Sequence, residues 1–239
     1  MNENTLTRNC LKNFILRIDF SGTVPFDEIA NAIKDMFVRR EERTVKGIRM
    51  IFNPAQGDVM PIMAEDASHE DLFVKGDGST LVLSRIDSSL VIQSLKYIDN
   101  SAYEDVLGRV VSCQWRARRV GLRYINSFSC EKNNGIAKIM KPPYAELVKK
   151  LSLGETVCRA MNVQSRITNE SNINKIQFGV PNSSFPKKIT RYDLLLDIDA
   201  FHVGDVESAD CTALVKQLNH DAYAIFREFI TDRQLGEMK

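Results

Sequence analysis

The chain has 239 residues, of which 44% are hydrophobic and 26% charged, and its formal net charge is +1 at pH 7. This composition is typical of a globular protein, and the length suits one large α+β domain or two small ones around a continuous core. The near-zero net charge excludes a generically basic nucleic-acid-binding protein but leaves room for a local basic patch.

The cysteines and the N-terminus bear on the compartment. The chain has 5 cysteines, far apart and without Cys-x-x-Cys spacing, namely Cys10, Cys113, Cys130, Cys158 and Cys211. This pattern favours reduced thiols over a disulfide framework. Residues 1–8 are polar, which predicts no signal peptide, and no apolar run approaches the roughly 18 residues of a membrane span. We therefore expect a cytoplasmic protein without a transmembrane segment.

The first half of the chain reads as a strand, a helix and four further strands before a second helix. Apolar residues alternate from Phe14 to Phe20 and predict a strand whose other face carries Ile15, Arg17 and Asp19. Pro25 opens a helix. We then expect a solvated helix end at 39–43, a strand over 46–52, a long irregular loop over 53–69, hairpin strands at 72–74 and 81–83, and a strand at 90–92.

The second half repeats this order with one strand fewer. A capping-box spacing at 101–104 predicts a helix that ends near 115–118, and a strand over 120–128 follows almost without a linker. Pro142 and Pro143 open another helix. The remaining patterns predict strands over 156–167, 175–180 and 192–200, and a long amphipathic helix over about 210–230.

The two halves therefore read β-α-β-β-β-β-α and β-α-β-β-β-α, and Leu16-Arg17-Ile18 corresponds to Leu122-Arg123-Tyr124. We predict an α+β fold in which the halves, 1–118 and 119–239, form one continuous domain with one curved antiparallel sheet backed by helices. Two architectures fit this order: a pseudo-symmetric saddle that resembles the TATA-binding-protein fold, and a helix-grip fold. We favour the duplicated sheet, and the fold analogy implies no DNA binding.

Two aspartates are the first candidate for chemistry. Asp197 and Asp199 are two residues apart and share one face of a strand. They are candidates for a divalent-metal site, with Asp19 or His202 as a further ligand. The alternative is a structural pairing with arginines, which we favour because an Asp-x-Asp pair alone is a weak motif and no glycine-rich phosphate loop accompanies it.

A basic cluster surrounds Trp115 and consists of Arg109, Arg116, Arg118, Arg119 and Arg123. One interpretation is phosphate or nucleic-acid contact, with Trp115 or Tyr124 stacking on a base. The other, which we favour, is that these arginines complement a helix end and pair with acids such as Asp197 and Asp199. The binding candidates on the central strand are Arg119, Arg123, Tyr124 and Asn126.

Two apolar segments are further candidates. Met60, Ile62 and Met63 lie in the expected loop and suit contact with a partner or a lipid, unless the loop covers the core. Tyr223, Phe226 and Phe229 on the last helix belong to the core or, in a helix-grip fold, line a ligand cavity. The three histidines show no metal spacing and no Gly-x-Ser-x-Gly is present, so we expect no cofactor.

The segment Gly-Leu-Arg-Tyr-Ile-Asn at 121–126 is distinctive. Together with Leu-Leu-Leu-Asp-Ile-Asp at 194–199, Tyr103 and Glu104 in the preceding helix, and Leu-Asn-His at 218–220, it resembles a sporadically distributed, uncharacterised bacterial family of about this length. The patchy distribution of that family implies an accessory role, such as phage defence or a toxin–antitoxin system. No catalytic residue follows from the resemblance.

We therefore expect a non-enzymatic binding or sensing protein that acts through a protein partner or self-assembly. One alternative is a helix-grip protein that binds a lipid or another apolar ligand. The other is a metal-dependent nuclease or nucleotide-processing enzyme that uses Asp197 and Asp199.

Overall fold

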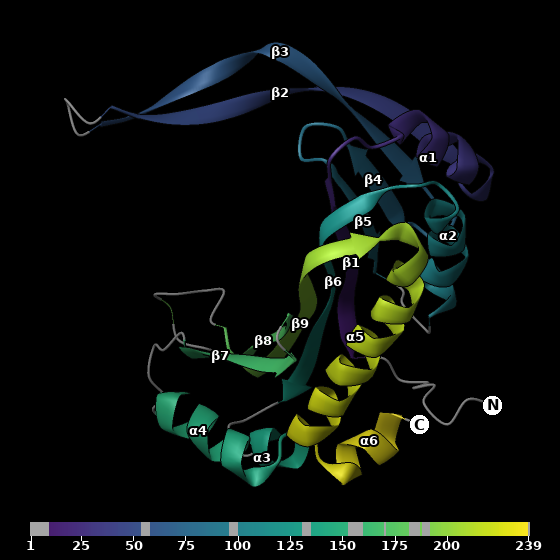
Figure 1. The fold of residues 1–239 in the computed structure, drawn as a ribbon. Coiled ribbons are helices and arrows are strands. Elements are labelled where there is room, and N and C mark those ends of the chain that lie inside the picture. Colours follow the sequence, from purple (N-terminus) through teal and green to yellow (C-terminus); the bar gives the residue numbers. More distant parts are fainter. Residues whose placement is uncertain are drawn as a thin grey trace.

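A computed structural model describes residues 10–53, 58–95, 100–130, 135–152, 160–169, 171–181, 187 and 192–238, with the backbone alone described at 45–53, 58–68, 101–102, 151–152, 160, 169 and 192. Within these residues the protein is an α+β structure with one nine-stranded antiparallel sheet and six α-helices (Figure 1). The strands are β1 (Leu11–Ser21), β2 (Arg39–Asn53), β3 (Asp58–Val74), β4 (Thr80–Ser84), β5 (Ser89–Ser94), β6 (Arg116–Cys130), β7 (Ala160–Asn169), β8 (Asn172–Val180) and β9 (Tyr192–Glu207). The helices are α1 (Phe26–Ile33), α2 (Ser101–Val111), α3 (Ile136–Ile139), α4 (Pro142–Ser152), α5 (Ser208–Phe229) and α6 (Asp232–Met238), and a 3-10 turn covers Lys34–Met36.

The strand order is β2-β3-β4-β5-β1-β6-β9-β8-β7, so β1 and β6 meet at the centre of the sheet. They pair in antiparallel register with Leu16 opposite Leu122. Strands β1 to β5 precede this junction in the sequence and strands β6 to β9 follow it. The centre of the sheet therefore joins segments that lie about a hundred residues apart in the chain.

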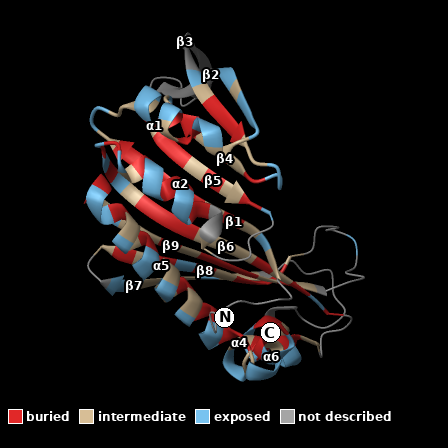
Figure 2. Ribbon diagram, turned by 90° about the vertical axis from the view of Figure 1, so that its right-hand side faces the viewer, coloured by how far each residue is buried: buried red, intermediate tan, exposed pale blue. Residues whose placement is uncertain are grey.

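The helices cover one side of the sheet. Helix α5 packs on β6 and β9, α2 packs on α5 and α1, and α4 packs on β7 and β8. Figure 2 views this side, where buried residues follow the strands beneath the helices. The apolar positions of the strands lie on this side, and Phe14, Leu16 and Leu122 are fully buried there. One hydrophobic cluster includes these residues and Phe226 of α5.

We call the other side of the sheet the open face. Alternation along the three central strands gives it the positions Ile15, Arg17 and Asp19 of β1, Arg119, Gly121, Arg123 and Ile125 of β6, and Asp197, Asp199, Phe201 and Val203 of β9. Within the described residues no helix lies over this side, and both β2–β3 and β7 extend towards it, away from α2 and α5 (Figure 1). The sheet is thus layered on one side only.

The prediction of an irregular loop over 53–69 is wrong. Residues 58–69 belong to β3, which pairs with β2 as a long two-stranded ribbon, while 54–57 lie outside the described residues. The predicted helix end at 39–43 is also wrong, because these residues begin β2. Apolar residues at successive positions hid the two-residue period of β3, and Pro61 argued against a strand. A proline is tolerated there because β3 pairs with β4 only from Glu70 to Val74, so its second edge is unpaired near Pro61 in the described chain.

Other element boundaries also differ from the predictions. Helix α2 ends at Val111 instead of 115–118, so Arg116, Arg118 and Arg119 lie on β6 and not at a helix end. Strand β9 continues to Glu207, and the short helices α3 and α6 were not predicted. Cys10, Cys113, Cys130 and Cys211 are free cysteines, and Cys158 lies outside the described residues. None of the described helices is both long and apolar enough to cross a membrane.

Candidate functional site

The charged positions of the sequence gather on the open face at the centre of the sheet. The helix side of the three central strands is largely apolar, whereas their open face carries six charged residues among apolar ones such as Ile15 and Phe201. Since β1, β6 and β9 are neighbours, their charged positions form one continuous group. We call this group the central ion network; its members are Arg17, Asp19, Arg119, Arg123, Asp197 and Asp199.

Arg123 and Asp197 form the closest pair between β6 and β9. Arg123 Nε donates to Asp197 Oδ1 at 2.9 Å, and its Nη2 donates to Oδ2 at 2.6 Å. The Asp197 side chain is 5% exposed and that of Arg123 is 42% exposed. The buried carboxylate therefore has both oxygens held by a guanidinium that remains in contact with solvent, a geometry in which charge-assisted hydrogen bonds are strong.

Arg119 links β9 to β1. Its Nη2 lies 3.4 Å from both oxygens of Asp199, and its Nη1 lies 3.7 Å from Asp19 Oδ2. Asp19 in turn accepts a hydrogen bond of 2.6 Å from Arg17 Nε. The guanidinium of Arg119 also lies over the ring of Phe201, 4.6 Å from its centroid, which adds a cation–π contact. Arg119 is thus held by two acids and one aromatic ring.

Gly121 makes room for this arrangement. A Cβ atom at position 121 would lie 2.9 Å from Phe201 Cβ and 3.3 Å from Arg119 Nη2. The first distance is shorter than ordinary carbon–carbon contact, so a side chain would displace Phe201 and Arg119. The close approach of Phe201 and Arg119 therefore explains why position 121 of Gly-Leu-Arg-Tyr-Ile-Asn is a glycine.

The protonation equilibria of the network reflect burial and pairing. Burial raises the pKa of Asp199 above its usual value, although Arg119 and Arg123 favour the carboxylate. The hydrogen bonds to Asp197 raise the pKa of Arg123. The raised pKa of Arg123 keeps its guanidinium charged, and the raised pKa of Asp199 means that this carboxyl loses its proton less readily than an ordinary aspartate.

The remaining predicted binding residues of β6 lie on the helix side. Tyr124 donates from its hydroxyl to Asn219 Oδ1 of α5 at 2.6 Å, and its ring centroid is 5.2 Å from that of Phe14. Asn126 is buried, donates to the Leu196 carbonyl at 3.2 Å and accepts from Cys10 Sγ. Both residues connect strands or helix to the core, and neither shares a surface with Arg119 and Arg123.

The structure places Met60 and Ile62 in β3 and so separates them from the other candidates. Met60 lies opposite Ile51 of β2, and Ile62 lies opposite Arg49 of β2. Their side chains lie outside the described part. The predicted site is thus divided among the open face, the core and the ribbon.

The arginines of the basic cluster around Trp115 pair with different acids. Trp115 is buried and donates from its indole nitrogen to the Val110 carbonyl, so it offers no face to a base. Arg109 pairs with Asp35, and Arg116 pairs with Glu207, each at 2.7 Å. The interpretation of these arginines as partners of acids agrees with these contacts, although the partners differ from residue to residue.

The suggested metal ligands are dispersed. His202 alternates with Asp199 and Phe201 along β9, so it lies on the helix side, where its Nδ1 is 2.7 Å from Asn172 Oδ1. Arg119 lies between Asp19 and Asp199. Among the described residues, no group of three or more His, Cys, Asp or Glu has the geometry to hold a metal ion.

The aromatic residues of α5 pack in the core. Phe226 stacks with Phe128, and Phe229 stacks with Tyr144 at a centroid distance of 3.7 Å.

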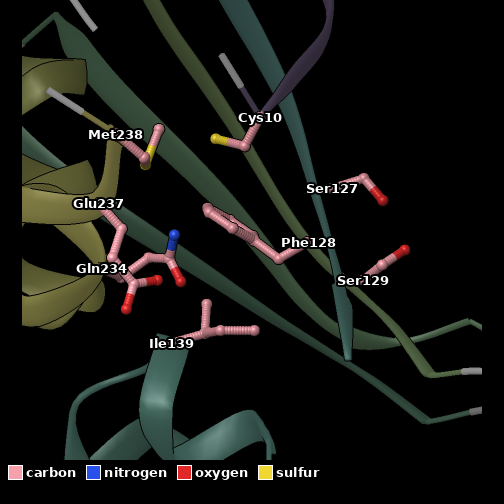
Figure 3. Close-up of a pocket in the computed structure, with 8 residues that line it drawn as sticks. All are labelled: Cys10, Ser127, Phe128, Ser129, Ile139, Gln234, Glu237 and Met238. Atoms are coloured by element: carbon pink, nitrogen blue, oxygen red, sulfur yellow. The ribbon is translucent and has the colours of Figure 1, made fainter. Parts of the chain in front are cut away.

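A separate groove of about 310 Å³ lies between the end of β6, α3 and α6 (Figure 3). Its lining includes apolar residues such as Phe128 and Met238 and polar residues such as Ser129 and Glu237. Burial raises the pKa of Cys10 in this groove to about 12, so its thiol is protonated at neutral pH.

Aliphatic side chains flank the central ion network on the open face. Val203 lies opposite Arg119 and is 48% exposed. On the outermost strand of the second half, Val163 is 58% exposed and Ile167 is 72% exposed. Their register through β8 places them on the same face as Asp197 and Phe201. The open face therefore combines paired charges at its centre with exposed aliphatic residues beside them.

Sequence reasoning missed the roles of Arg17, Gly121 and Phe201. Phe201 was missed because the predicted strand ended one residue before it. The alternation of Arg17 and Asp19 with the apolar residues of β1 was visible, but only the β1–β6 pairing puts them beside Arg119.

A search against models of known protein families finds no match, and a search of curated proteins finds no match either.

Proposed function

We propose that this chain is a non-enzymatic binding protein whose open face takes a protein partner, in a bacterial accessory system of the phage-defence or toxin–antitoxin kind. The observation that carries the binding role is the composition of the open face. Its charges are paired with one another, and exposed aliphatic residues lie beside them. The bacterial context rests on the resemblance carried by residues 121–126.

The pairing of charges favours a protein over a nucleic acid. Phosphate binding needs arginines and lysines whose charge is available to the ligand. On the open face Arg123 is neutralised by Asp197, and Arg119 by Asp199 and Asp19. A face with alternating charges and aliphatic flanks matches the mixed polar and apolar composition of protein–protein interfaces.

The test uses the purified products of the genes that neighbour this one, with binding measured by biolayer interferometry. We expect one of them to bind the full chain, and Val203→Glu to weaken that binding at least tenfold, about 1.4 kcal/mol, because it puts a charge into the interface. Val38→Glu is the matched control, because Val38 is 77% exposed and lies outside the open face.

Equal affinity of the two variants would show that the open face is not the binding surface. Binding of the wild-type chain to DNA or RNA with a steep salt dependence would replace the proposal with a nucleic-acid function. In that case Arg123→Ala should reduce the salt slope by about one.

We also propose that the fold is a duplicated saddle similar to that of the TATA-binding protein. Leu16 and Leu122, which correspond in the repeat, face each other at the centre of the sheet. Both ends of the sheet bend away from α5 (Figure 1), whereas a grip needs the sheet to wrap around the helix. If the halves form one domain, 1–118 and 119–239 produced separately should each lack a cooperative unfolding transition, and two cooperative fragments would contradict this.

A further inference from the structure

The two outermost strands of the sheet, β2 and β7, lie at its opposite ends (Figure 2). Strand β7 pairs with β8 on one side, and within the described chain no strand pairs with its other side, which we call the outer edge of β7. An unpaired edge offers backbone donors and acceptors to a further strand. Charged side chains, prolines and bulges normally prevent such pairing, so their distribution shows which edge is protected.

The base of β2 carries this protection, and β7 carries little of it. Every residue from 39 to 43 is charged, whereas β7 contains Arg166 as its one charged residue and has no proline. Arg166 is neutralised by Glu228 of α5, since its Nη1 donates to Glu228 Oε2 at 2.6 Å. The register of β7 against β8 is also regular from Ala160 to Ile167. The outer edge of β7 is therefore suited to accept another strand.

The side chains of β7 alternate between the two sides of the sheet. Val163, Ser165 and Ile167 lie on the open face, and all three are exposed. Gln164 and Arg166 lie on the helix side, where Arg166 reaches Glu228. Ser165 therefore has an exposed aliphatic residue two positions away in either direction along the strand. Its immediate neighbours on the other side of the sheet are an amide and a guanidinium.

This arrangement around Ser165 is complementary to itself. We propose that two copies of the chain pair their β7 edges antiparallel around a two-fold axis at Ser165, perpendicular to the sheet, so that the two sheets continue as one. Each Val163 then lies opposite Ile167 of the second copy, and each Gln164 lies opposite Arg166 of the second copy. Aliphatic side chains meet on the open face and polar ones on the helix side, which are favourable cross-strand pairs.

The neighbouring registers fit less well. Paired residues must lie on the same side of the sheet, so the two-fold axis passes through a residue that meets its own copy. An axis at Arg166 would place two guanidinium groups opposite each other, and like charges in that position are destabilising. An axis at Gln164 would place each aliphatic Val163 opposite a polar Ser165. The axis at Ser165 avoids both mismatches.

Charge does not oppose this contact. Lys175 of β8 lies opposite Ser165 and is exposed on the open face. In the joined sheets the two copies of Lys175 are three strand spacings apart, roughly 14 Å, and their repulsion is screened over about 8 Å at physiological ionic strength. A single strand pairing is smaller than a standard interface, so we expect a dimer that dissociates on dilution. This inference goes beyond the proposed function, because it concerns the edge of the sheet and a second copy.

The test is sedimentation velocity of the full chain from about 1 to 200 µM, a range that suits a small interface. The wild-type chain should change from monomer to dimer across this range. Ser165→Lys and Ser165→Glu each place like charges opposite each other on the axis, so each should raise the dissociation constant about tenfold or more. An equimolar mixture of the two variants should restore the dimer, because lysine then faces glutamate. Val38→Lys is the control, since Val38 is 77% exposed and lies outside β7, and it should change the constant less than about threefold.

A second measurement tests the register itself. Ser165→Cys places two thiols opposite each other on the axis, within the separation that a disulfide needs, so oxidation with copper–phenanthroline should give a covalent dimer on a non-reducing gel. Val163→Cys is the matched control, because its two copies are offset by roughly 13 Å along the strands, too far for a disulfide. A monomer at all concentrations, equal cross-linking of the two variants, or a mixture of Ser165→Lys and Ser165→Glu that stays monomeric would overturn the proposal.

Discussion

The central strands differ in their strand pairing from the outer part of the β2–β3 ribbon, residues 48–53 and 58–63, which we call the outer ribbon. At the centre, β1 and β6 are paired on both edges, helices cover their apolar side, and the acids and bases on the open face neutralise each other. In the outer ribbon each strand has one neighbouring strand in the described chain. The comparison teaches that each central strand is held by two neighbouring strands and a layer of helices, whereas the outer ribbon is held by one strand pairing.

The largest expected difference between the two regions is in stability. Leu122→Ala removes a fully buried side chain and should lower the free energy of unfolding by about 2–5 kcal/mol. Ile62→Ala in the outer ribbon, where β3 pairs with β2 alone in the described chain, should change it by no more than about 0.5 kcal/mol. Urea unfolding measures the free energy of unfolding of both variants. A similar loss in the two variants would show that the ribbon belongs to the cooperative core.

The central ion network should contribute the next largest effect. Arg123→Ala leaves the carboxylate of Asp197, only 5% exposed, without its bidentate partner. Since Arg123 is partly solvated, we expect a loss of about 2 kcal/mol, below that for a fully buried pair. Arg233→Ala breaks the exposed pair with Glu237 and serves as the control, with an expected loss of about 0.5 kcal/mol or less. Equal losses would mean that Asp197 is solvated in the folded protein.

Two glycines should respond to the same substitution with opposite signs. Gly121→Ala brings a methyl group to 2.9 Å from Phe201 Cβ and should destabilise the fold by about 1–2 kcal/mol. A Cβ atom at Gly108 of α2 would have no atom within 4 Å apart from the backbone of its own helix, so Gly108→Ala should stabilise the fold by up to about 1 kcal/mol. Thermal unfolding distinguishes the signs. A neutral Gly121→Ala would show that Phe201 and Arg119 are loosely placed.

The smallest expected effect is a pH dependence that differs between two carboxylates. Burial raises the pKa of Asp199, so its protonation favours the folded state, and this contribution is lost as the pH rises through the raised pKa. The hydrogen bonds from Arg166 lower the pKa of Glu228, so its contribution is present above the usual glutamate pKa and is lost as the pH falls through the lowered one.

Chemical unfolding of Asp199→Asn and Glu228→Gln between pH ~3 and ~6 checks these signs. As the pH rises, the wild-type chain should lose stability relative to Asp199→Asn and gain it relative to Glu228→Gln. The Glu228 effect should be the weaker one, because its side chain is 44% exposed and screened by solvent. Slopes of the same sign would contradict the opposite pKa directions.

Local patterns in the sequence were sufficient for the elements whose apolar residues keep one period. The alternation in β1 and the stripe of α5 predicted both elements to within a few residues. The β3 strand could not be found in this way, because a ribbon with apolar residues on both faces has no period of two. The pairing of Arg123 with the acids of β9 followed from alternation and is confirmed. The contact of Arg119 with Asp19 required the β1–β6 pairing, which no local pattern contains.

The junction between β1 and β6 also sets an order of events during synthesis. β1 emerges from the ribosome about a hundred residues before β6, so the edge that will receive β6 has no neighbour while the first half is being made. The β2–β3 hairpin and the β4–β5 pair need only local loop closure and can form in that interval. During that interval β1 is an edge strand that carries Arg17 and Asp19. Charged residues on an edge strand disfavour pairing with another nascent chain.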